Sequence, residues 1–186
     1  MQLIETPFPG LMIFEPKVWD DTRGYFFESY NKKVLESNNI EINFVQDNQA
    51  SSTYGVVRGL HYQLHPFAQT KLIRVLKGKI FDVVVDLRKG SSTYGESFAI
   101  ELSDENKKQL FIPKGFAHGY SVLSETAEVF YKCDQFYNKE AEGGIIYNDP
   151  ALEIDWQVPS DKMLVSDKDL HYNVFEKSIH NFTYDF

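Results

Sequence analysis

The sequence predicts an all-β protein, folded as an antiparallel sandwich or barrel. Short runs rich in β-branched and aromatic residues recur along the chain with turn signals between them, and helical periodicity is rare. Aromatic residues make up 15% of the chain, an enrichment that favours strands. Many short strands at this spacing are typical of two packed antiparallel sheets.

Apolar runs predict the strands, and turn-forming residues separate them. Lys77-Gly78 and residues 103–106 are predicted as hairpin turns, because Gly, Ser, Asp and Asn favour tight chain reversals. In order along the chain, the strands are predicted at 11–18, 24–30, 44–51, 56–63, 70–76, 79–87, 97–102, 109–112, 119–123 and 127–137.

Helices are predicted to be few and short. The clearest is 32–37, with Asn31 as its N-cap. From about residue 150 the chain is polar and contains Pro150 and Pro159, which indicates an irregular segment with a short helix or two. The length suits a single domain spanning 1–186.

The strand at 79–87 carries a pattern that bears on the site. Phe81, Val83 and Val85 alternate with Asp82 and Asp86, so the carboxylates lie on the face opposite an apolar row. In a double sheet that opposite face is either solvent or a polar cavity. A jelly roll with a site in its interior would accommodate Asp82.

The composition restricts the possible binding partners and the expected cellular compartment. The net charge of −8 argues against a nucleic-acid-coating surface, and basic residues near the histidines suggest a small anionic ligand instead. No apolar run is long enough to span a membrane, and the N-terminus does not resemble a signal peptide. Cys133 is the only cysteine, so a reducing cytoplasm is the expected location.

His61 is the leading candidate for a general base. An imidazole titrates near neutral pH and accepts a proton with little tuning. The alternative is a core histidine that hydrogen-bonds backbone groups. On a regular strand Arg58 would point to the opposite face from His61, so both reach one site only if Gly59 permits a bulge.

Lys71 and Tyr131 are the other candidates for catalytic groups. Lys71 begins an otherwise apolar strand and could stabilise a developing oxyanion, although a lysine at a strand start is usually a solvated edge residue. Tyr131 could act as an acid, although tyrosines on strands more often pack. Cys133 is predicted to be a small core residue and not a nucleophile.

A bound metal is not predicted. The run from Pro113 to His118 resembles the second metal motif of cupins, but the first motif needs a His-x-His pair and a glutamate. The sequence around His61 and His65 lacks that glutamate, and scattered imidazoles do not make a ligand shell.

Six segments in collinear order carry a resemblance to a known family. They read DDTRGYFFE (20–28), FVQDN (44–48), RGLHYQ (58–63), DVVVDLR (82–88), IPKGFAHG (112–119) and SDKD (166–169). Together they resemble the dTDP-4-dehydrorhamnose 3,5-epimerase family from about residue 3 to Asp169. The chain departs from the family pattern after Trp156 and past Leu170, so no role is carried over to the last residues.

The resemblance implies a cupin-type antiparallel jelly-roll barrel with a few short helices, working without a metal or other cofactor. It implies epimerisation of dTDP-4-dehydro-6-deoxy-D-glucose at C3 and C5, on the route to dTDP-L-rhamnose and cell-surface carbohydrate. It also implies a homodimer in which the N-terminal strands of one subunit reach the partner's site.

The resemblance also assigns roles to residues. His61 would be the base, Asp169 its partner, Lys71 the group that steadies the enolate, and Tyr131 the acid on the other face of the sugar. The residues that would bind or surround the nucleotide sugar are Arg23, Glu28, Gln46, Asn48, Arg58, His118, Tyr137, Glu142 and Lys168.

Other functions remain open on the sequence alone. A related enzyme could epimerise a single carbon, or isomerise the ketone, of another dTDP-4-keto-6-deoxy sugar. A non-catalytic nucleotide-sugar-binding cupin would share much of the binding set, and a metal-dependent cupin enzyme would require a ligand shell that the sequence does not provide.

Overall fold

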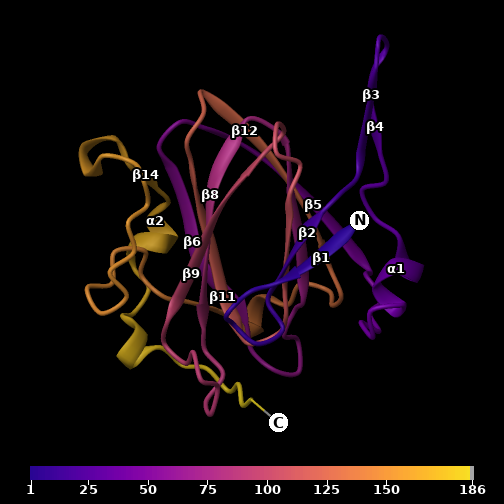
Figure 1. The fold of residues 1–186 in the computed structure, drawn as a ribbon. Helices are drawn as coiled ribbons and strands as arrows, with labels where there is room; N and C mark the ends of the chain where they lie inside the picture. The colour runs from indigo at the N-terminus through magenta and orange to yellow at the C-terminus, as the bar shows by residue number, and fades with distance from the viewer. Residues whose placement is uncertain (185–186) are drawn as a thin grey trace.

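Two antiparallel sheets packed face to face form the body of the protein (Figure 1), in a computed structural model that describes residues 1–184. The predicted all-β jelly-roll architecture is confirmed. The first sheet has the order β1 (Gln2–Glu5), β2 (Met12–Glu15), β10 (Gln109–Ile112), β7 (Lys71–Lys77), β12 (Thr126–Cys133) and β5 (Gln46–Thr53).

The second sheet carries Arg58 and His61 on one strand, and Asp82 and His118 on two others. Its order is β13 (Glu142–Gly144), β6 (Val56–Gln63), β11 (Phe116–Val122), β8 (Lys79–Asp86) and β9 (Ser97–Ser103). A short strand, β14 (Leu164–Val165), pairs with β6 in parallel. Strands β3 (Val18–Asp21) and β4 (Gly24–Phe27) form a separate hairpin that projects from the barrel in Figure 1.

Helical structure is sparse, as predicted. Helix α1 (Lys32–Glu36) is capped by Asn31, whose side chain accepts a hydrogen bond from the Lys33 N–H. Helix α2 (Asp167–Leu170) begins after Ser166 near the C-terminus. The remaining turns are 3₁₀ helices at Lys139–Ala141, Ser160–Lys162 and Phe175–Lys177. No helix in the described part of the chain has the length and apolar character needed to cross a membrane.

Two predicted hairpins are wrong. Gly78 joins β7 to β8, and residues 103–106 join β9 to β10, but in both cases the two strands belong to different sheets. Turn residues specify that the chain reverses, whereas the partner of each strand depends on how the sheets pack. The predictions also miss β1, β3, β13 and β14, all of four residues or fewer, and the strand predicted at 127–137 ends at Cys133.

Apolar side chains fill three layers. One cluster lies between the sheets and includes Ile73, Val84 and Val129. A second lies behind the second sheet, where the C-terminal segment covers it with Trp156 and Phe182. A third includes Phe14, Leu35, Leu72 and Phe111, which places α1 against the outside of the first sheet. Burying each of these large side chains contributes about 1.5–3 kcal/mol.

Strand β8 is therefore buried on both faces. Val83 and Val85 pack in the outer cluster, whereas Val84 packs between the sheets. Asp82 and Asp86 are fully buried, so neither carboxylate faces solvent. Each one is hydrogen-bonded inside the protein, as buried charges require.

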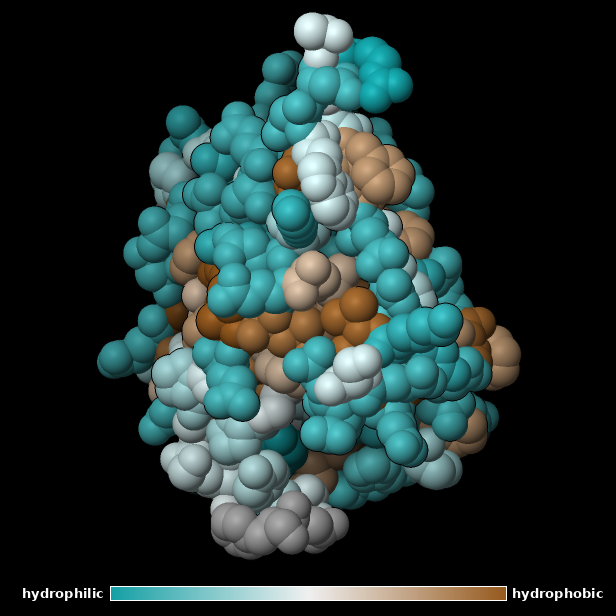
Figure 2. Space-filling model, turned by 45° about the vertical axis from the view of Figure 1, so that its right-hand side comes forward, coloured by the Kyte–Doolittle hydropathy of each residue, from teal (hydrophilic) through white to brown (hydrophobic). Residues whose placement is uncertain are grey.

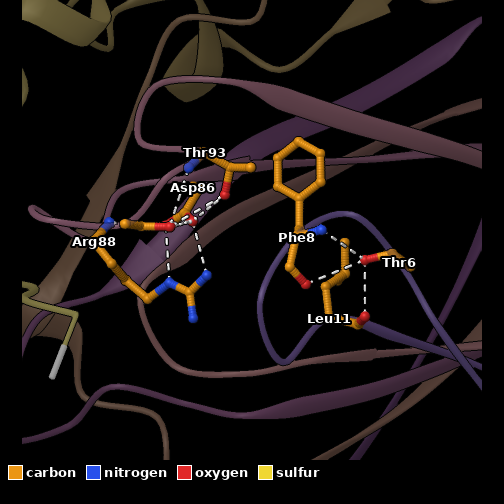
Figure 3. Close-up of polar contacts among 7 residues, drawn as sticks. Thr6, Phe8, Leu11, Asp86, Arg88 and Thr93 are labelled. Carbon is orange, nitrogen blue, oxygen red and sulfur yellow. Dashed lines mark hydrogen bonds and ion pairs between the residues drawn. The ribbon is translucent and has the colours of Figure 1, made fainter. Parts of the chain in front are cut away.

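Asp86 anchors the loop that follows β8 (Figure 3). Its oxygens accept hydrogen bonds from Nε of Arg88 at 2.9 Å and from the hydroxyls of Ser91 and Thr93 at 2.6 and 2.8 Å. The Arg88 guanidinium also lies 4.3 Å from the Phe116 ring centroid. In the same view, the Thr6 hydroxyl donates to the Leu11 carbonyl at 2.8 Å and closes the turn between β1 and β2.

Candidate active site

Strand alternation aims the candidate residues into the space between the two sheets. On β7, Ile73 and Val75 belong to the inner cluster, so Lys71 points the same way. On β11, Phe116 and Tyr120 belong to the inner cluster, so His118 also points inward. Tyr131 packs against this cluster from β12. Residues distant in the sequence therefore face the same interior space between the sheets.

A β-bulge brings Arg58 and His61 to the same face. Arg58 pairs with Tyr120 and His61 pairs with His118, so two residues of β6 oppose the single residue Gly119 on β11. This is the irregularity that the sequence required for both side chains to reach one site. Gly59 adopts a φ of +128°, and a Cβ there would lie 2.5 Å from the Cα of Gly119. Only glycine fits this crossing of two backbones.

His61 is hydrogen-bonded to a carboxylate. Its Nε2 lies 2.7 Å from Oδ1 of Asp169, and the other oxygen, Oδ2, accepts a hydrogen bond from the Gly59 N–H. The Asp169 N–H in turn donates to the Oγ of Ser166, the N-cap of α2. Burial acts to raise the pKa of Asp169, but the hydrogen bond and charge of His61, together with the Gly59 and Ser166 hydrogen bonds, hold it below its usual range.

His118 forms a second imidazole–carboxylate pair. Its Nε2 lies 2.9 Å from Oδ2 of Asp82, whereas Oδ1 of Asp82 is buried with no hydrogen-bond partner in the described chain. Burial lowers the pKa of His118, Asp82 opposes this shift, and the charges of Lys71 and His61 lower the pKa further. His118 is therefore neutral at physiological pH.

Lys71 and Tyr131 lie together on neighbouring strands. The Lys71 ammonium is 5.9 Å from the Tyr131 ring centroid, and Lys71 lines a small cavity with His118. Burial lowers the pKa of Lys71, while Cys133, Asp82 and Glu142 act in the opposite direction. Burial raises the pKa of Tyr131 to about 12, so the phenol keeps its proton. Burial likewise raises the pKa of Cys133 to about 11, as expected for an unreactive core thiol.

Polar residues at the rim form a connected network. Glu142 accepts hydrogen bonds from the Tyr137 hydroxyl at 2.9 Å and from the Lys168 ammonium. Burial opposes the charge of Glu142, but Lys168 and Tyr137 hold its pKa below the usual range. Gln46 accepts from the Tyr137 N–H at 3.1 Å and donates to Asn48 at 3.1 Å.

Arg58 is held by a residue that the sequence analysis missed. Its Nε and Nη2 donate to the Ser52 hydroxyl at 3.1 and 3.0 Å. No sequence signal distinguishes Ser52 from the other polar residues of its strand. Tyr172 was also missed, and its ring lies edge-on to His61 with centroids 5.8 Å apart. It belongs to the C-terminal segment for which the sequence indicated no role.

Arg23 and Glu28 lie outside this cluster. Arg23 is at the tip of the β3–β4 hairpin, where its side chain is 88% exposed and paired with Asp21. Glu28 follows β4 and is exposed. Its neighbours Phe27 and Ser29 contact Arg74 and Gln109 of the first sheet, so Glu28 lies beside that sheet and not within the cluster.

Within residues 1–184, no three His, Cys, Asp or Glu side chains converge in an arrangement that could hold a metal ion. The two imidazoles of the site each face a carboxylate through Nε2. A metal-independent reaction remains a prediction from the resemblance.

The chain and its fold match known enzymes. Residues 5–177 match the sequence model of the dTDP-4-dehydrorhamnose 3,5-epimerase family. The chain is 51% identical over 176 residues to dTDP-4-dehydrorhamnose 3,5-epimerase of Shigella flexneri, covering 94% of this chain and 96% of that relative.

Solved structures of similar fold point to the same family. The crystal structure of dTDP-4-dehydrorhamnose 3,5-epimerase from Elizabethkingia anophelis matches with a TM-score of 0.90 and 50% identity, covering 95% of this chain and 97% of that one. The Legionella pneumophila dTDP-6-deoxy-D-glucose-3,5-epimerase, solved in complex with dTDP-4-keto-L-rhamnose, has a TM-score of 0.90 and 46% identity, covering 95% of this chain and 93% of that one. This chain therefore belongs to the dTDP-4-dehydrorhamnose 3,5-epimerase family.

Proposed function

We propose that the protein inverts C3 and C5 of dTDP-4-dehydro-6-deoxy-D-glucose to give dTDP-4-dehydro-L-rhamnose, in the cytoplasm and without a cofactor. The observation that carries the proposal is the His61–Asp169 pair, 2.7 Å apart, because His61 is the cross-strand partner of His118, and His118 lines one small cavity with Lys71. Family membership supports the same reaction.

The carboxylate of Asp169 determines which imidazole nitrogen is basic. Its low pKa keeps Asp169 ionised, so it can only accept a hydrogen bond and Nε2 of His61 must carry the proton. The lone pair is then on Nδ1, which forms no hydrogen bond within the described chain. Nδ1 is therefore the atom proposed to remove a proton from the sugar.

The substrate ketone makes this proton removable. Protons at C3 and C5 flank the C4 carbonyl, so when one leaves to Nδ1 of His61 its electron pair forms a C=C bond and the carbonyl oxygen becomes an enolate. Lys71 is proposed to stabilise that oxygen with its ammonium. Tyr131 is proposed to return a proton to the opposite face of the carbon, which completes the inversion. Solvent then removes the proton from His61 and reprotonates Tyr131.

Basic and polar residues around this centre are proposed to hold the nucleotide sugar. Arginine and lysine suit a diphosphate because they form charge-assisted hydrogen bonds to its oxygens. The residues proposed for binding are Arg23, Glu28, Gln46, Asn48, Arg58, His118, Tyr137, Glu142 and Lys168.

A homodimer is proposed to complete each site. Arg23 lies at the tip of a projecting hairpin whose Trp19, Tyr25 and Phe26 are exposed, and Glu28 is an exposed residue just after that hairpin. Figure 2 shows the face with the N-terminal strands turned forward, and an apolar band crosses it between polar regions. Exposed aromatic side chains beside an arginine are common at protein interfaces.

Solvent exchange tests the reaction. Wild-type protein incubated with dTDP-4-dehydro-6-deoxy-D-glucose in D₂O should place deuterium at C3 and C5 and yield the L-rhamno product, as followed by ¹H NMR. His61→Asn should abolish exchange at both carbons. Tyr131→Phe should still exchange at C3 but fail to complete inversion. Deuterium at one carbon only would indicate a single-carbon epimerase. Tight dTDP binding with no exchange would indicate a non-catalytic binder.

Subunit complementation tests the dimer. Arg23→Ala and His61→Asn proteins should each be inactive as homodimers. When the two are co-expressed, a mixed dimer contains one site with both native residues, so activity should return to about a quarter of the wild-type value if subunits pair at random. No recovery despite demonstrated mixed dimers would contradict the proposed exchange.

A further inference from the structure

Two glycines on the edge strand β13 leave space that tyrosines occupy. Gly144 is the cross-strand partner of His61, so a side chain at Gly144 would stand beside the imidazole on the same face. A Cβ there would lie 2.5 Å from Cε2 of Tyr172. The Tyr172 ring therefore fills the position that a cross-strand neighbour of His61 would take.

The Tyr172 ring also contacts the imidazole. The two ring centroids are 5.8 Å apart with an interplanar angle of 66°, an edge-to-face arrangement. Asp169 holds Nε2 of the same imidazole at 2.7 Å. One hydrogen bond leaves the ring free to tilt about the bonded nitrogen, whereas an aromatic wall beside it restricts that motion.

The segment that carries Tyr172 is anchored around it. Asp169 lies in α2, three residues earlier, and accepts from the Gly59 N–H. On the other side, the Asn173 carbonyl accepts from the Ile146 N–H at 3.0 Å. The Lys168 ammonium, which is paired with Glu142, lies 6.0 Å from the centroid of the Tyr172 ring.

We propose that Tyr172 is a positioning residue that fixes the orientation of the His61 imidazole. This inference rests on the proposed function for its kinetic consequence. Tyr172 acts through His61 by ring contact, so the aromatic ring is required and the phenolic hydroxyl is not. Gly144 is part of the same device, because it is the residue that admits the ring.

The test compares Tyr172→Leu, Tyr172→Phe and Gly144→Ala. Loss of the ring in Tyr172→Leu should lower kcat by about 10- to 100-fold, since small misplacements of a catalytic group have effects of this size, while KM stays within about twofold. Tyr172→Phe should recover kcat to within about threefold of wild type. Gly144→Ala, whose backbone lies outside the left-handed region, should displace the ring and reproduce the Leu defect.

The ¹⁵N NMR signals of the His61 imidazole report its tautomer. A purely structural role of Tyr172 would leave these signals unchanged. Wild type and Tyr172→Phe should show His61 as one Nε2–H tautomer, whereas Tyr172→Leu and Gly144→Ala should show exchange broadening or mixed tautomers. Gly143→Ala is the matched control: its Cβ would meet the Tyr62 ring instead, at 2.3 Å from Cε2, so the His61 signals should not change. Titration with dTDP checks that each variant is folded.

Two results would overturn the inference. One is an unaltered His61 spectrum with wild-type kcat in both folded Tyr172→Leu and Gly144→Ala. The other is a loss in Tyr172→Phe as large as that in Tyr172→Leu, which would assign the role to the hydroxyl. If wild-type protein shows no epimerisation, the proposed function fails, but the NMR comparison still decides whether Tyr172 orients His61.

Discussion

His61 and His118 are cross-strand partners on β6 and β11, and each imidazole binds a carboxylate of its own through Nε2. The two pairs differ in access. The His61 side chain is 32% exposed, whereas that of His118 is 9% exposed. The greater access of His61 supports the proposal that His61, and not His118, is the base.

Replacing the aspartate by asparagine should lower kcat by different amounts in the two imidazole–carboxylate pairs. In Asp169→Asn the amide group can donate to Nε2 of His61, which would move the imidazole proton to Nδ1 and remove the basic lone pair. We expect kcat to fall by about 10²- to 10⁴-fold. Asp82→Asn should lower kcat by less than about tenfold, because His118 is proposed to bind substrate and not to transfer a proton. Equal losses of kcat in the two variants would contradict the assignment of His61 as the base.

Lys71 and Tyr131 should titrate at different pH values, because burial shifts their pKa values in opposite directions. Burial lowers the pKa of Lys71 from 10.5 and raises that of Tyr131 to about 12. As pH rises, the ammonium therefore loses its charge before the phenol loses its proton. We expect kcat/KM to decline as pH rises through the lowered pKa of Lys71, below 10.5, and this decline should be measured from pH 7 to 10.

Lys71→Arg is the matched variant for that profile. A guanidinium stays protonated throughout this range, so the variant should be slower but should lack the decline assigned to Lys71. An identical alkaline limb in wild type and Lys71→Arg would assign the decline to another group.

Strand periodicity was sufficient to predict much of the fold. Strands β6 and β10 begin and end at the predicted residues, and in a regular strand the two-residue repeat determines which face a residue occupies. The same repeat gives no information on the partner strand. This is why Gly78 was predicted as a hairpin turn although it joins strands of different sheets.

The site was harder to predict, for related reasons. The pairing of His118 with Asp82 depends on the register of β11 against β8, which places Asp82 opposite Tyr120. The shared face of Arg58 and His61 depends on a bulge that the sequence could only suggest through Gly59. Tyr172 reaches His61 from a segment with no periodic pattern. Each of these contacts is set by tertiary packing and not by local sequence.

A comparison of two Asp-x-Arg pairs measures how burial changes the contribution of an ion pair to stability. In each pair the aspartate accepts hydrogen bonds from the backbone N–H and the guanidinium of the arginine two residues later. The Asp86 side chain is 0% exposed and that of Asp21 is 50% exposed. Asp86→Asn should lower the free energy of unfolding by about 3–5 kcal/mol at pH 7, because it leaves the Arg88 charge buried without its partner. Asp21→Asn should cause no measurable change.

The effect of Asp86 should depend on pH in a defined direction. Burial acts to raise the pKa of Asp86, but Arg88, Ser91 and Thr93 outweigh it and hold the pKa below 3.8. A carboxyl with a lowered folded-state pKa contributes stability above its unfolded pKa and loses it as pH falls through the folded value. The difference between wild type and Asp86→Asn in urea unfolding, at one protein concentration, should narrow below pH 3.8. A difference independent of pH down to the acid limit of folding would exclude the ionised carboxylate as its source.

Alanine substitutions at Gly59 and Gly24 distinguish the cost of backbone strain from the cost of steric contact. Gly59 lies in the bulge that brings Arg58 and His61 to one face. The φ angles of Gly59 and Gly24 are similar, +128° and +123°, but a Cβ at Gly59 would meet the Gly119 Cα at 2.5 Å, whereas at Gly24 nothing in the same chain lies within 4 Å. Gly24→Ala should therefore cost at most about 1–3 kcal/mol of strain. Gly59→Ala adds a clash between two backbones, so its cost should be roughly 2–6 kcal/mol. Urea unfolding of both variants at one protein concentration measures the difference. If the two substitutions cost the same, contact with Gly119 is not what requires glycine at position 59, and conformation alone explains the residue.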